Sequence, residues 1–143
     1  ASMSGTALMD VAYRYDQSGS NYGIQRSQTT ADVAATFNWG SSSWSGTMTV
    51  SNFDQDNPIV SNAGFTSFSF ALDPSSSTFY SADSTDVLDN AWQGGASVAG
   101  QFFGDSSPEQ TGGTINVNLY KSGSTDTSGA NDFYVAEGIY LLD

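Results

Sequence analysis

The stretch ADVAATFNWGSSSWSGTMTV, residues 31–50, decides the fold. In its first half, apolar side chains occupy every odd position from Val33 to Trp39, and polar side chains occupy most of the even positions. After the four small residues GSSS, glycine or an apolar residue occupies every even position from Trp44 to Val50, and serine or threonine occupies every odd one. Alternation with a period of two is typical of a strand with one buried face. Because the connection is so short, the stretch predicts an antiparallel β-hairpin.

Similar alternation extends in both directions from this hairpin. The other runs cover residues 6–16, 65–72, 79–80, 96–104, 114–120 and 132–142. Turn residues bracket these runs, and the strong helix formers Glu and Lys are scarce. About eight strands without a helical spacer indicate an antiparallel barrel or sandwich. The last run is apolar on both faces apart from Glu137, which suits pairing with the first run, so we predict an all-β antiparallel barrel of about eight strands with Gly-rich corners.

The length of 143 residues suits one hydrophobic core, so we expect a single domain, residues 1–143. No run approaches the roughly 18 apolar residues of a spanning helix, and no signal peptide opens the chain. We expect no membrane insertion by this domain. Any export signal or lipid anchor is expected upstream of Ala1, in a longer exported protein of which this chain is a piece.

The charge is strongly one-sided. Fifteen acidic residues face only three basic ones, Arg14, Arg26 and Lys121, which gives a formal net charge of -12. Such a field repels phosphate backbones and anionic lipid headgroups, so nucleic acid and membrane surfaces are poor partners. The self-repulsion also opposes compaction unless salt screens it.

Conventional catalytic groups are missing from the sequence, which has no His and no Cys. A Ser-His-Asp or Cys-His relay is therefore excluded. Glu109 and Glu137 are the only glutamates, and their predicted positions, a corner and the last strand, do not suit a paired-carboxylate glycosidase. We expect this domain not to be an enzyme.

Two acidic loops contain the hard oxygen ligands that calcium prefers. One loop carries Asp54 and Asp56, and the other carries Asp83, Asp86 and Asp89. Neither spacing matches an EF-hand loop, so weak calcium sites and plain solvated loops both remain open.

A small apolar ligand or haem inside the barrel is another alternative. Without His, haem would depend on Tyr or Met, and Tyr13, Tyr22 and Tyr80 are the candidate ligands. We expect large side chains to fill the interior instead: Met9, Tyr13, Phe37, Trp39, Trp44 and Phe68.

Three aromatic residues fall outside clean alternation: Tyr22, Phe53 and Trp92. Exposed in loops, they would be anchors for a protein or carbohydrate partner. The alternative is that they cap the ends of the barrel, and the sequence leaves both interpretations open.

Glycines concentrate in one segment of the chain. It contains Gly100-Gln101-Phe102-Phe103-Gly104, then Pro108-Glu109, then Gly112-Gly113-Thr114. Glycine permits backbone conformations closed to other residues, and Glu109 is placed to accept hydrogen bonds from loop amides. We interpret Gly100, Phe102, Gly104, Glu109, Gly112 and Gly113 as a barrel-corner motif, with a binding role as the alternative.

The chain resembles one family over nearly its whole length. The resemblance is carried by this motif, the hairpin, the opening Ser4-Gly5-Thr6-Ala7 and the closing Ala136-Glu137-Gly138-Ile139-Tyr140. The family is the β-barrel domain of the transferrin-binding protein B and factor H-binding protein class of bacterial surface lipoproteins. The chain departs from it at Asp105, where the family tends to have Pro, in a connection one residue longer, and in a Leu141-Leu142-Asp143 ending that is not basic. The preceding handle domain that contributes to partner binding in several members is not among these residues, so the resemblance does not identify a partner.

The resemblance implies a non-enzymatic binding domain, secreted or on the outer surface of a bacterium, that contacts a protein partner through its loops. The alternatives are a structural or adhesive module of a larger surface protein, with loop calcium, and a carrier of a small ligand or haem in the lumen. No cofactor other than calcium is expected, and the oligomeric state stays open.

Overall fold

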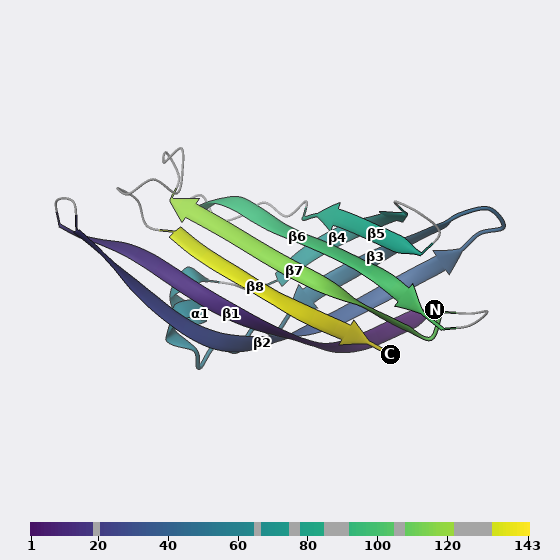
Figure 1. Ribbon diagram of the computed structural model, residues 1–143, viewed down its shortest axis with the longest axis horizontal. Helices are drawn as coiled ribbons and strands as arrows, with labels where there is room; N and C mark the ends of the chain where they lie inside the picture. The colour runs from purple at the N-terminus through teal and green to yellow at the C-terminus, as the bar shows by residue number, and fades with distance from the viewer. Residues whose placement is uncertain (19–20, 65–66, 75–77, 85–91, 105–107, 122–132) are drawn as a thin grey trace.

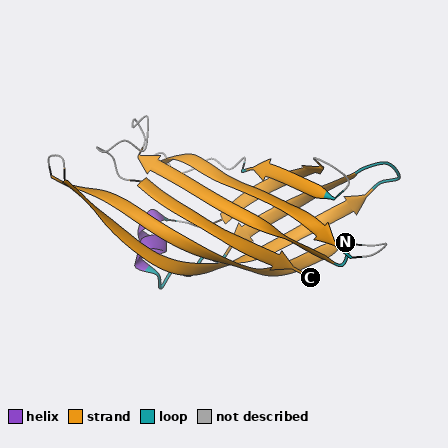
Figure 2. Ribbon diagram, in the orientation of Figure 1, coloured by secondary structure: helices purple, strands orange, loops and turns teal. Residues whose placement is uncertain are grey.

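The computed structural model describes residues 1–18, 21–64, 67–74, 78–84, 92–104, 108–121 and 133–143. The strands are β1 (Ser2–Ser18), β2 (Asn21–Trp39), β3 (Trp44–Ser51), β4 (Ser67–Pro74), β5 (Phe79–Asp83), β6 (Trp92–Phe103), β7 (Gln110–Lys121) and β8 (Phe133–Leu142). Each strand pairs antiparallel with the next, and β8 pairs with β1, so the sheet closes into a barrel (Figures 1 and 2). The predicted all-β barrel of eight strands is confirmed.

The hairpin of residues 31–50 forms as the alternation predicts. Trp39 pairs with Trp44, and the Gly40 N–H donates a 2.7 Å hydrogen bond to the Ser43 carbonyl across the turn. β2 begins at Asn21, well before the alternating run, because its first part pairs with the far end of β1. The β1–β2 ribbon therefore extends past the neighbouring strands (Figure 1).

Closure of the barrel depends on β1 and β8. Their register runs from Gly5 opposite Leu142 to Arg14 opposite Phe133. Beyond the Gly5–Leu142 pair, the backbones of Ser4 and Asp143 exchange two hydrogen bonds of 3.1 and 3.2 Å. The two termini consequently lie side by side at one end of the barrel (Figure 1).

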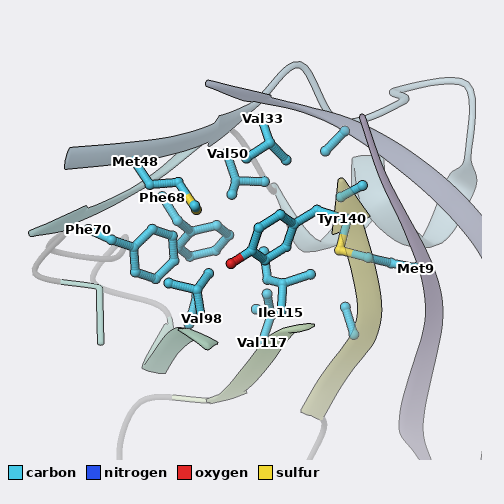
Figure 3. Packing of buried hydrophobic residues seen from close by; sticks show 14 of the residues in the cluster. Met9, Val33, Met48, Val50, Phe68, Phe70, Val98, Ile115, Val117 and Tyr140 are labelled. Atoms are coloured by element: carbon cyan, nitrogen blue, oxygen red, sulfur yellow. The ribbon is translucent and has the colours of Figure 1, made fainter. Parts of the chain in front are cut away.

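The lumen is packed with side chains from all eight strands. Figure 3 shows part of this packing, around Val50, Phe68 and Tyr140. The largest fully buried side chains include Tyr80, Phe37, Met9, Met48, Leu72 and Ile115. Of the residues expected to fill the lumen, Met9, Phe37, Trp44 and Phe68 are buried, and Tyr13 packs partly buried against them.

Trp39 departs from that expectation. Its ring is about half exposed at the end of β2, and it packs against three rings, those of Phe37, Trp44 and Phe102, at centroid distances of 5.1 to 6.0 Å. It lies at the end of its strand, so one face of the ring covers the aromatic packing and the other meets solvent.

One short helix, α1 (Pro58–Ala63), interrupts the strands, and the sequence interpretation missed it. Asn57 caps its start by accepting hydrogen bonds from the Ile59 and Val60 N–H groups, and Gly64 ends it with a left-handed φ of 69°. Ile59 and Val60 are buried in the core. The Asn57 amide also donates to the carbonyl of Gln28, which fastens the helix to β2.

Inside the barrel, two tyrosine hydroxyls meet above a glycine. The Tyr80 and Tyr140 oxygens are 2.7 Å apart, and Tyr80 also lies 2.8 Å from the hydroxyl of Thr111, which donates to the Gln101 carbonyl. A Cβ on Gly100 would lie 2.5 Å from each tyrosine oxygen. Glycine at this position therefore makes room for a buried hydrogen-bond network that joins β5, β6, β7 and β8.

Gly100→Ala tests this account. Because the added methyl group overlaps both hydroxyls, we expect the free energy of unfolding to fall by about 1–3 kcal/mol in urea denaturation. Gly95→Ala, on the same strand, is the matched control, since no atom lies within 4 Å of its Cβ position. Equal effects of the two substitutions would contradict the proposed overlap.

The same network predicts a loss of stability in alkali. Burial raises the pKa of Tyr80 and of Tyr140 above the ordinary 10.0, and for Tyr140 repulsion from an ionised Tyr80 adds to the effect. A phenol with a raised pKa in the folded state stabilises the fold fully below the unfolded pKa, and this contribution is lost as the pH rises above about 10. The urea concentration at which half of the native chain is unfolded should decrease as the pH is raised from about 9 to about 11. The decrease should be smaller for Tyr140→Phe. Parallel curves for the two proteins would rule the explanation out.

Candidate functional site

Two pairs of adjacent aromatic residues place large rings on the outside of the barrel. Neighbours along a strand point to opposite faces. On β5, Tyr80 points inward, so Phe79 points outward. On β6, Phe102 packs against the core, so Phe103 points outward.

Three aliphatic side chains continue this apolar surface across the closing strands. Leu8 on β1 and Ile139 on β8 are directly opposite each other, and Leu141 follows Ile139 on the same face. The five side chains of this outer apolar patch are exposed by 43 to 63%: Phe79 50%, Phe103 43%, Leu141 56%, Ile139 63% and Leu8 49%. Such a group of large exposed apolar side chains is typical of an interaction surface.

A groove of about 410 Å³ lies within the patch, between Phe79 and Phe103. Its floor contains Gly112 and Gly113 of β7 and Gly100 of β6, so part of it is bare backbone. A Cβ on Gly112 would lie 3.3 Å from the Leu141 side chain and 3.6 Å from the Phe103 ring. Phe103 and Leu141 therefore flank the same glycine.

The glycine motif thus has a different geometry from the predicted barrel corner. Gly100 pairs with Gly113 inside the β6–β7 ladder, and only Gly104, with a φ of 130°, lies at the connection between these strands. The backbone N–H of Glu109 donates a 3.1 Å hydrogen bond to the Phe103 carbonyl at the start of the connection, while its side chain is exposed. The corner interpretation is wrong for the paired glycines, because they lie in regular ladder positions that bring backbones close together.

Carboxylates lie along one side and one end of the patch on the outer wall. Register places Asp10 opposite Glu137, and the same row continues through β7 and β6 to Asp83. This row lies two residues along the strands from the row of Leu8 and Ile139, on the same face of the sheet. Asp73 is exposed beside Ser81, at the β5 end of that apolar row.

The three aromatic residues expected in loops occupy other positions. Phe53 is only 3% exposed and packs edge-on against Phe68 at 5.9 Å, so its interpretation as an exposed anchor is wrong. It follows β3 directly and turns into the core beside α1. Tyr22 lies in β2 opposite Asp16, and Trp92 begins β6, so neither lies in a loop; their side chains are outside the described part.

The predicted calcium ligands lie in two separate segments of the chain, as their sequence positions indicate. In the first, the Asp54 carboxylate accepts a hydrogen bond from the backbone N–H of Asp56 at 3.0 Å, and in the second, Asp83 is exposed at the end of β5. Asp86 and Asp89 lie outside the described residues. Within the described ranges, acidic side chains do not gather in any group of three or more suited to a metal ion.

The candidate haem ligands are also engaged in packing. Tyr13 stacks on Tyr134 with centroids 4.4 Å apart, and the Tyr80 hydroxyl belongs to the network above Gly100. Tyr22, the third candidate, has no described side chain. Tyr13 and Tyr80, which the sequence offered as haem ligands, therefore have structural partners inside the barrel.

Comparison with known proteins does not assign the chain to a family. No protein-family model matches the sequence, and a search of curated proteins found no match to it. In the described part of the chain, no helix has the length and hydropathy needed to cross a membrane.

Truncation of two phenylalanines distinguishes core from surface. Phe53→Ala should lower the free energy of unfolding by about 3–5 kcal/mol, because it opens a cavity in the core. Phe79→Ala removes the same atoms from a half-exposed position and should cost about 1 kcal/mol or less. Urea denaturation of both variants measures the difference. A larger loss for Phe79→Ala would contradict the assignment of the outer patch.

Proposed function

We propose that this barrel is a non-enzymatic binding domain that contacts a protein partner through the outer apolar patch of β1 and β5–β8. One observation carries the proposal: five large apolar side chains are exposed around a glycine-floored groove, although the barrel has a well-filled interior. Aromatic side chains beside a concave surface are characteristic of the central contacts of protein interfaces.

The location of this contact differs from the sequence-based expectation. That expectation assigned partner contacts to loops, whereas Phe79, Phe103 and Leu141 lie on strands. Strands hold side chains more rigidly than loops do, so less conformational entropy is lost when a partner binds.

The resemblance to the transferrin-binding protein B and factor H-binding protein class supports a location outside the cell. The closed eight-stranded antiparallel barrel is compatible with that class. We propose secretion or display on the outer surface of a bacterium, for which an acidic surface rich in serine and threonine is well suited. The lumen-carrier alternative has less support, because Phe37, Met48, Tyr80 and other large side chains occupy the interior.

The test is affinity capture followed by measurement with a purified partner. Immobilised native barrel, Phe103→Ser and Ile24→Ser are exposed to the same mixture of extracellular proteins. Ile24 is the matched control, because it is a similarly exposed apolar residue on β2, outside the patch. A partner should be retained by the native barrel and by Ile24→Ser, and lost with Phe103→Ser.

The partner is then purified, and its dissociation constants are compared by biolayer interferometry. Phe103→Ser should weaken binding at least tenfold, and Ile24→Ser less than twofold. The proposal fails if every protein that the native barrel captures binds Phe103→Ser equally well.

A further inference from the structure

We infer that the partner presents a cationic segment to this surface, in which an apolar side chain enters the groove and nearby lysines or arginines meet the carboxylates that border the patch. The inference rests on the proposed function and names the chemistry of its partner. It follows from the register of the strands, which fixes where the charges lie relative to the groove.

The acidic groups border the apolar patch at successive levels of the sheet. Asp10, Glu137 and Asp83 occupy the row directly adjacent to Leu8 and Ile139, and Asp73 ends the apolar row on β4. All four carboxylates are exposed. At neutral pH they place negative charge along one side and one end of the patch.

The basic residues lie beyond this acidic row. Arg26 is opposite Ala12, one level further along β1 from Asp10, and Arg14 is one level beyond that. Lys121, the third and last basic side chain of the sequence, pairs with Trp92 at the far end of β7. Neither the patch nor the acidic row beside it contains a lysine or arginine. Arg26 lines the same surface hollow as Asp10 and Glu137, so a partner meets four carboxylates and one guanidinium along this side and end of the patch.

Repulsion between Asp10 and Glu137 lowers the stability of the isolated protein. They are directly opposite each other on the outer face of β1 and β8. Like charges in that arrangement repel and destabilise the pair of strands. A lysine or arginine from a partner would relieve the repulsion, so binding and electrostatic relief are coupled.

The spacing suits a short extended segment. The groove floor includes Gly112, and the acidic row crosses β7 at Asn116, which is four residues away. At about 3.3 Å per residue this is roughly 13 Å. A partner residue in the groove and a long basic side chain two to four positions away along an extended chain would span it.

A second copy of the chain is a poor occupant by the same reasoning. Each copy carries a formal charge of -12, so two copies repel each other electrostatically. Electrostatic complementarity instead favours a basic partner and predicts association that weakens as salt increases.

Two synthetic peptides test the inference. One has the sequence Lys-Ser-Lys-Ser-Trp-Ser-Lys-Ser-Lys, and its analogue has Glu in place of every Lys. Binding to ¹⁵N-labelled barrel is followed through the amide resonances of Gly112 and Gly113, in about 20 and about 300 mM NaCl. We expect the lysine peptide to shift these resonances at a concentration at least tenfold lower than the glutamate peptide does, and this preference to shrink at high salt.

Charge variants of the barrel locate the effect. Glu137→Gln and Asp83→Asn should each weaken binding of the lysine peptide severalfold. Asp56→Asn, which neutralises an exposed carboxylate in the loop before α1, should leave binding unchanged. Glu137→Gln should also raise the thermal midpoint at low salt, because it removes repulsion from Asp10, so weaker binding by this variant would not reflect loss of fold.

The outcomes separate the inference from the proposed function. Equal, salt-independent binding of both peptides at the groove would overturn the cationic partner and leave an apolar binding surface standing. No shift of the two glycine resonances by either peptide would also overturn the inference, and the capture experiment alone would then decide the proposed function. A dimer that forms in high salt and is abolished by Phe103→Ser would identify a second copy as the occupant and overturn it as well.

Discussion

The interior of a closed eight-stranded barrel has room for a limited volume of side chains, and this constraint organises the whole molecule. Eight strands direct alternate residues into one shared space, and large rings such as Phe37 and Tyr80 already fill much of it. Where two tyrosines meet, the facing residue is Gly100. Where two aromatic residues are adjacent in a strand, only one can point inward. The interior packing follows from the limited volume, and the outward rings of the patch follow from the alternation of side chains along a strand.

Much of the fold could be predicted because its signals are local. Residues 31–50 contain their own alternation and their own turn, and the two-faced pattern of the last strand indicated closure against β1. The missed helix is six residues long and begins from one capping asparagine, Asn57, too short a segment for a periodic pattern. The misassigned Phe53 belongs to the same segment, which turns back into the core after β3.

The binding surface was harder to predict, because it is created by register. Phe79, Gly112 and Leu141 come from three strands that are distant in sequence, and one row of strand pairs brings them together. A sequence signal did exist in the adjacent pairs Phe79–Tyr80 and Phe102–Phe103, since one member of each must point outward. That signal indicates exposed rings but does not say that they flank a groove. The acidic row is equally a product of register, and it is invisible in the order of residues along the chain.

The glycine segment connects the two sides of the wall. On the inner side, Gly100 leaves space for the tyrosine network, and on the outer side, Gly112 is buried beneath Phe103 and Leu141, where it lines the groove. A side chain at the first position would act mainly on stability, because it would meet buried hydroxyls. A side chain at the second would enter the groove, where its Cβ would lie 3.0 Å from the Tyr140 carbonyl oxygen and 3.3 Å from the Leu141 side chain, so it would act on binding as well as on packing. One short hairpin can therefore serve the fold and the proposed contact at once, because alternate residues of a strand face different surroundings.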